Sequence, residues 1–188
     1  MVETYTIKHR GQLNEYLDEV MIYTSRGMYI TLIDGKSYND NLSDEYKAHL
    51  SEFKSKVRKL FTSEFVECSF ATLCEVVDKL AFQEDGYLIM HIDENCLEAY
   101  VMGSTQIKLI TDGKISSLPN GVYRIKEEDS LILGTNYFFS LVNDEGVLVD
   151  ALLSGTCKVW SKYLINRISD NTYFECCNLS CCTVRYRE

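Results

Sequence analysis

The sequence predicts a layered α+β sandwich, and three observations lead to this fold class. Short runs rich in Tyr, Ile, Thr and Val recur along the chain, and such residues suit pleated strands. Two helical segments separate the first strands from a long middle run of strands, and two further helical segments precede the last strand. Antiparallel sheets that two separate helix pairs must cover are typical of a layered α+β domain.

The N-terminal part begins with strands. The runs 3–8, 19–24 and 28–33 have strand composition, and Arg26-Gly27 between the last two indicates a hairpin turn. These three segments are therefore expected to contribute strands near the start of the domain.

A helix of about 18 residues is predicted from Asp44 onward, with Ser43 as its N-cap. Apolar residues recur on one face at spacings of four and three. They are Tyr46, Leu50, Phe53, Val57 and Leu60. His49 lies off this stripe, so we expect it to be exposed. A second helix is predicted over 69–82.

From residue 87 the apolar period changes to two, which predicts strands. Asp112-Gly113 is a strong hairpin signal, and Pro119-Asn120-Gly121 predicts another turn. The predicted strands are 87–92, 97–102, 106–111, 122–126 and 130–135, followed by helices at 147–153 and 157–168 and a strand after Asn171.

Length, charge and hydropathy limit the classes of function that the chain can have. The 188 residues suit a single domain, 1–188, and a formal charge of −9 disfavours nucleic acid and anionic lipid as partners. No run of about 18 apolar residues and no apolar signal core are present, so a cytoplasmic protein is expected. Protein partners or cations are the expected ligands, and the oligomeric state stays open.

Half of the eight cysteines crowd into one stretch: Cys176, Cys177, Cys181 and Cys182. In a cytosolic chain they are expected to be reduced thiols. On one extended strand they alternate between two faces, so four sulfurs converge on one ion only if a tight hairpin forms. A metal or redox module at 176–182 is an alternative to the interpretation of these cysteines as small buried strand residues. The three histidines are scattered and are expected to be packing or surface residues.

Five short pieces, in order, resemble landmarks of the type 2C (PPM) Ser/Thr phosphatase family. They are Gly11–Tyr16 (R-x-x-N-E-D), Leu32–Gly35 (V-x-D-G), Ala99–Gln106 (A-x-V-G-D-S-R), Asp129–Tyr137 (D-x-L-L-L-x-T-D-G) and Asp170–Thr172 (D-N-x-T). The resemblance covers nearly the whole chain and implies a four-layer α-β-β-α sandwich of two antiparallel sheets flanked by helix pairs. Only residues 107–128 separate the third piece from the fourth, so the family's flap beside the active site is expected to be missing.

By the same resemblance, the chemistry would depend on Mg²⁺ or Mn²⁺, which bind oxygen ligands and activate water. The positions that match family ligands are Asp34, Gly35, Asp170, Asn136 and Glu15. Asn136 stands where the family has aspartate, and an amide holds a dication more weakly than a carboxylate.

The rest of the implied site departs from the family. Tyr16 replaces an aspartate, Ser104 replaces the aspartate of the G-D pair, and Gly11 falls on the phosphate-binding arginine. We therefore expect no metal, or one weakly bound Mg²⁺ or Mn²⁺. The hypothesis is a pseudophosphatase that binds protein partners, and the alternatives are an active metal-dependent Ser/Thr phosphatase and the cysteine module.

Overall fold

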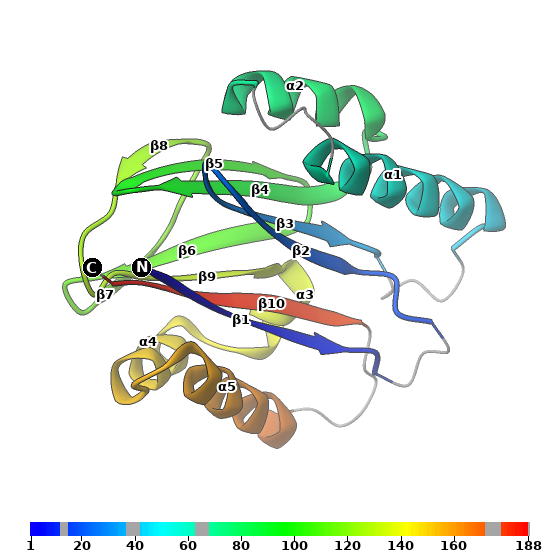
Figure 1. The fold of residues 1–188 in the computed structure, drawn as a ribbon. Helices are drawn as coiled ribbons and strands as arrows, with labels where there is room; N and C mark the ends of the chain where they lie inside the picture. Colours follow the sequence, from blue (N-terminus) through cyan, green and yellow to red (C-terminus); the bar gives the residue numbers. More distant parts are fainter. Residues whose placement is uncertain (12–14, 37–41, 63–67, 172–177, 188) are drawn as a thin grey trace.

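The computed structural model describes residues 1–188 except 12–14, 37–41, 63–67, 172–177 and 188. Two five-stranded sheets, in which all recorded pairs are antiparallel, lie face to face (Figure 1). Sheet A has the order β1 (Val2–His9), β10 (Leu179–Tyr186), β9 (Ser130–Thr135), β6 (Thr105–Thr111), β7 (Lys114–Ser117). Sheet B has the order β2 (Glu19–Ser25), β3 (Gly27–Asp34), β4 (Gly86–Asp93), β5 (Cys96–Met102), β8 (Gly121–Arg124).

Helices cover the outer face of each sheet (Figure 1). The pair α1 (Asp44–Thr62) and α2 (Phe70–Leu80) packs on sheet B. The helices α3 (Asn136–Leu141), α4 (Asp144–Leu153) and α5 (Cys157–Asn171) lie on sheet A. The predicted four-layer α-β-β-α sandwich is thus confirmed, while the short α3 was not predicted.

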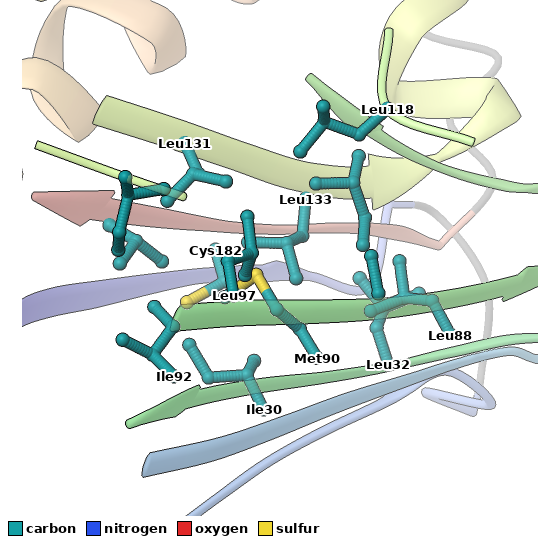
Figure 2. Close-up of a cluster of buried hydrophobic side chains, with 14 of the residues drawn as sticks. Ile30, Leu32, Leu88, Met90, Ile92, Leu97, Leu118, Leu131, Leu133 and Cys182 are labelled. Atoms are coloured by element: carbon teal, nitrogen blue, oxygen red, sulfur yellow. The ribbon is translucent and has the colours of Figure 1, made fainter. Parts of the chain in front are cut away.

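The central core lies between the two sheets. Leu32, Leu88 and Met90 of sheet B point toward Leu133 and Cys182 of sheet A, as Figure 2 shows. These five side chains are fully buried, so each sheet packs its inner face against the other. This burial of apolar area is the main stabilising contribution to the sandwich.

The first helix follows the predicted stripe. Leu50, Phe53 and Val57 are buried against sheet B, while the last buried position is Phe61 rather than the predicted Leu60, which is only partly buried. The hydroxyl of Ser43 accepts from the backbone N–H of Tyr46 over 3.1 Å, which is the N-cap that the sequence predicts.

The shortened stretch 107–128 consists of the rest of β6, the four-residue strands β7 and β8, and tight turns. The chain leaves sheet A at β7 and joins sheet B at β8, so the strands of this stretch all pair within the two sheets. This short stretch of strands and turns agrees with the prediction that the flap is missing. Among the described helices, none is both long and apolar enough to cross a membrane.

Candidate functional site

Two buried aspartates lie at the open end of the β2–β3 hairpin. Asp34 is the last residue of β3, and Asp18 immediately precedes β2. Glu19 pairs with Ile33, so continuing this register by one residue places Asp18 opposite Asp34. Their exposed fractions are 3% and 4%. A hairpin end therefore brings two carboxylates together in the interior.

Asp18 is held from both sheets. Its Oδ1 accepts from the backbone N–H of Gly35 over 2.9 Å, and its Oδ2 accepts from the hydroxyl of Ser180 in β10 over 2.6 Å. The hydroxyl of Tyr16 is hydrogen-bonded to the same Ser180. A side chain at position 35 would collide with the backbone of Leu17, so only glycine permits this close approach.

Asp34 has an equivalent set of partners. Its Oδ1 accepts from the backbone N–H of Lys36 over 2.9 Å, and its Oδ2 accepts from the hydroxyl of Ser104, between β5 and β6. Gly86 lies opposite Asp34 in β4, and a Cβ there would overlap the Ser104 hydroxyl. Glycine at position 86 thus makes room for the Ser104–Asp34 contact.

All four oxygens of the two carboxylates accept hydrogen bonds from the protein. Ser180 belongs to sheet A and Ser104 leads into β6 of sheet A, whereas the hairpin belongs to sheet B. The two serine–aspartate contacts therefore join the sheets at this end of the sandwich. Charge-assisted hydrogen bonds of this kind are stronger than neutral ones.

Burial shapes the electrostatics of the pair. Burial raises the pKa of Asp18 to about 6, and the charge of Asp34 acts in the same direction. Burial also raises the pKa of Asp34 above its ordinary value. Desolvation disfavours the charged form of each carboxyl, and the two like charges repel.

Two lysines lie near the pair and oppose this effect. The ammonium of Lys54 in α1 donates to the carbonyl of Leu17 over 3.0 Å, next to Asp18, and its charge favours the ionised form of Asp18. The charge of Lys36 does the same for Asp34. Each carboxylate therefore has a neighbouring cation supplied by the chain.

Among the predicted ligands, Asn136 joins Asp34 and Gly35 at this end. Its backbone N–H donates to the carbonyl of Ser104 over 2.7 Å, and its amide oxygen accepts from Gln106 over 2.6 Å. Ser104 thus links Asn136 to Asp34. Asn136 is exposed at the start of α3, and its backbone rather than its side chain makes the contact with Ser104.

Glu15 and Asp170 are not joined to Asp34 by any hydrogen bond or ion pair in the described part of the chain. The side chain of Glu15 is exposed, and its carbonyl accepts from Asn178. Asp170 is exposed near the end of α5 and borders a hollow with Asp150 and Arg167. Their assignment as ligands stays a prediction.

Sequence reasoning missed Asp18. The N-E-D comparison directed attention to Glu15 and Tyr16. A two-residue turn at Arg26-Gly27 would place Glu19 opposite Asp34, whereas the structure pairs Ser25 with Gly27 and so shifts the register by one residue. Counting outward from the predicted turn therefore does not find the pair.

The expectation for His49 was also wrong. Its side chain is only 11% exposed, because its Nε2 lies 2.7 Å from Oδ2 of buried Asp85 and its ring stacks on Phe82. The hydroxyl of Tyr46 donates to the same Asp85 over 3.1 Å. A polar contact, rather than an apolar stripe, draws His49 inward.

The donor set can be compared with what a two-metal centre requires. Two dications carry four positive charges, whereas Asp18 and Asp34 supply two negative charges and already accept hydrogen bonds on every oxygen. Within the described ranges, no three His, Cys, Asp or Glu side chains gather as a metal-binding group. These residues do not fit a dinuclear centre.

The two described cysteines of the cluster, Cys181 and Cys182, lie on opposite faces of sheet A and so do not form a shared metal site. Cys181 packs in the core under α4 and α5, while Cys182 points into the core between the sheets. Burial raises the pKa of both thiols, which makes them poor thiolate ligands. Cys176 and Cys177 lie outside the described residues.

Comparison with solved structures identifies the fold. The chain is similar to the Mycobacterium tuberculosis serine/threonine phosphatase PstP/Ppp, with a TM-score of 0.76, 12% identity and coverage of 100% of this chain and 99% of that one. It is similar to the photosystem II phosphatase PBCP, with a TM-score of 0.78, 10% identity and coverage of 100% and 99%. RsbX in complex with magnesium gives a TM-score of 0.72, 10% identity and coverage of 98% and 94%.

These similarities define the class: the chain has the fold of the type 2C (PPM) Ser/Thr phosphatases over its whole length. The likeness is one of fold, at sequence identities near one residue in ten. The sequence matches no protein-family model and no curated protein.

Proposed function

We propose that this chain is a pseudophosphatase, which keeps the type 2C fold and acts as a protein-binding or regulatory module. The observation that carries the proposal is the hydrogen bonding of Asp18 and Asp34. Ser104 and Ser180 donate to these carboxylates and so occupy one lone pair on each acceptor oxygen, which leaves fewer for a metal. The carboxylate pair then serves to join the two sheets.

The neighbouring charges support the same proposal. Lys54 and Lys36 place ammonium groups near Asp18 and Asp34, which reduces the attraction of the pair for a dication. Asn136 offers a neutral amide at the position that resembles a family aspartate. The proposed metal content is therefore none, or one weakly bound Mg²⁺ or Mn²⁺.

The proposed partner is a protein. The formal charge of −9 disfavours nucleic acid and anionic membranes, and the cytoplasm is the proposed location. Because residues 107–128 are used by the sandwich, recognition of a partner would use the outer helices or strand edges rather than a flap.

Calorimetric titration with Mn²⁺, beside a p-nitrophenyl phosphate assay on the same samples, tests the proposal. The set comprises the wild type and the variants Asp18→Ala, Asp34→Ala and Asp170→Ala. We expect no turnover, and either no heat of binding or weak binding that Asp34→Ala abolishes. Mn²⁺-dependent turnover that is lost in Asp34→Ala would refute the proposal.

The second candidate is an active Mg²⁺- or Mn²⁺-dependent Ser/Thr phosphatase. The buried Asp18–Asp34 pair favours it, because two oxygen-donor carboxylates lie at one end of a phosphatase-type sandwich. Under this candidate, Asp18 would act as a ligand in place of Glu15. Turnover that requires both Asp18 and Asp34 would support it.

A further inference from the structure

His91 lies on the outer face of sheet B, where three neighbouring strands place side chains opposite one another. In the strand register, His91 of β4 pairs with Tyr29 of β3 on one side and with Glu98 of β5 on the other. The His91 side chain is only 12% exposed, and its ring stacks on that of Tyr29 with 4.1 Å between the ring centroids. Phe70, the first residue of α2, stacks near the same ring at 6.3 Å. Sheet B and the start of α2 therefore enclose the imidazole.

Each ring nitrogen of His91 faces an acceptor. Nδ1 lies 2.9 Å from a carboxylate oxygen of Glu98, and Nε2 lies 2.8 Å from the backbone carbonyl oxygen of Arg26, in the β2–β3 turn. An ionised carboxylate and a carbonyl can only accept hydrogen bonds, whereas a neutral imidazole has a single N–H to donate. Both contacts are hydrogen bonds only when both ring nitrogens carry a proton. The geometry thus corresponds to the positively charged imidazolium.

The β2–β3 turn lies directly against His91. Gly27 has a φ of +86°, and a Cβ built on it would lie 2.8 Å from Nε2 of His91 and 2.4 Å from the carbonyl oxygen of Ile92. Glycine allows the turn to approach this closely, which brings the Arg26 carbonyl within reach of the ring. A single side chain of β4 thus joins the turn to β5, although β2 and β5 are not neighbours in sheet B.

Among the residues that the structure describes, Glu98 is the one carboxylate that forms a hydrogen bond with His91. The other titratable groups around the stacked rings of His91 and Tyr29 are Tyr29 itself from β3, Asp93 from β4 and Cys68 from the segment before α2. Burial, followed by the charge of Glu98, raises the pKa of Tyr29, so this ring stays neutral. The Arg26 side chain is exposed to solvent. The proton on His91 therefore decides whether both of its contacts are held.

We propose that His91 is a pH-sensitive latch, which holds the β2–β3 turn to β5 and opens when the imidazole loses its proton. The charge of a histidine side chain changes between about pH 5 and 8. Once the charge is lost, the lone pair of one ring nitrogen faces either Glu98 or the Arg26 carbonyl, and that contact becomes repulsive. The stacking on Tyr29 loses its cation–π contribution at the same time. The latch is closed in acid and loosens as the pH rises, whether or not the Asp18–Asp34 pair binds a metal.

NMR spectroscopy of the full chain across the range in which histidine titrates tests the proposal. Long-range proton–nitrogen correlation spectra of the imidazoles should show both ring nitrogens of His91 protonated at about pH 5.5. Amide hydrogen exchange of residues 24–28, corrected for its intrinsic pH dependence, should become about threefold to tenfold faster by about pH 8.5, because the turn loses one hydrogen bond. A His91 ring with one proton at about pH 5.5, or turn exchange that is unchanged while His91 titrates, would overturn the proposal.

Two variants distinguish the latch from a purely structural contact. Glu98→Gln supplies an amide that can donate to the neutral imidazole, so both contacts persist after the proton is lost and exchange in the turn should stay slow at high pH. His91→Gln removes the titrating group, so exchange there should no longer depend on pH. His9→Gln, at the exposed end of β1, is the matched control and should behave as the wild type does. The proposal fails if Glu98→Gln loosens with pH like the wild type, or if His91→Gln keeps the pH dependence.

Discussion

Asp18 and Asp34 close the open end of the β2–β3 hairpin, and the backbone N–H of Gly35, the residue after Asp34, donates to the Asp18 carboxylate over 2.9 Å. Both aspartates are buried, and each also accepts from a serine: Asp18 from Ser180 in sheet A, and Asp34 from Ser104 in the turn between β5 and β6. The pair therefore combines mutual repulsion with strong local hydrogen bonding, and its energetics can be measured directly.

The pKa of Asp18 leads to a prediction for stability against pH. Its pKa in the folded state is raised to about 6, so the folded protein binds a proton more tightly than the unfolded chain does. The free energy of unfolding is then expected to fall as pH rises from about 4 to about 6. Asp18→Asn should remove the part of this fall that Asp18 contributes, leaving that of Asp34, and be more stable at pH 7 by about 1–3 kcal/mol.

Urea unfolding at several pH values measures this effect. Asp93→Asn is the control, because Asp93 is exposed at the end of β4 and should leave the pH dependence unchanged. An Asp18→Asn variant with the same slope as the wild type would contradict the prediction.

The role of Lys54 can be tested by removing its charge. Lys54→Met should lower the free energy of unfolding at pH 7 by about 1 kcal/mol, because the Leu17 carbonyl loses a donor and Asp18 loses its neighbouring cation. The same variant should bind Mn²⁺ more tightly than the wild type. Lys59→Met, on the exposed face of the same helix, should change neither quantity.

Restoring carboxylates to the site should create metal affinity. Ser104→Asp puts a carboxylate at the residue that contacts Asp34, and Asn136→Asp adds a second one at the residue whose backbone N–H donates to the carbonyl of Ser104. Without metal, repulsion is expected to lower the melting temperature of the double variant. Mn²⁺ should raise it again, because binding to the folded state stabilises that state. If adding Mn²⁺ left the melting temperature of the double variant unchanged, this expectation would be wrong.

Glycine at position 86 is predicted to be essential for the Ser104–Asp34 contact. In Gly86→Ala the new methyl group would overlap the Ser104 hydroxyl, so the hydrogen bond to Asp34 must break or the strands must shift. Such overpacking should cost about 1–3 kcal/mol in unfolding free energy. Gly155→Ala is the control, as nothing lies within 4 Å of an added Cβ there.

Local pattern predicted most of the fold because the forces behind it are local. The period of two, the stripe from Leu50 to Val57 and the turn at Arg26-Gly27 each depend on neighbours in sequence. Short α3 was missed, since its six residues are too few for a helical period to emerge. The four-layer arrangement came from the resemblance to the type 2C family, and the structure confirms it.

For the candidate site, the sequence predicted some of the residues, and the tertiary structure alone gave the contacts between them. The sequence alone determined that Asp34 ends a strand before Gly35, that Asn136 stands where a carboxylate is expected, and that the flap has no residues to form it. Only the tertiary structure decided that Asp18, rather than Glu15, joins Asp34, and that Ser180 and Ser104 donate to them. The physical reason is that hydrogen bonds between the two sheets join residues far apart in the chain, and no local periodicity records which of them meet.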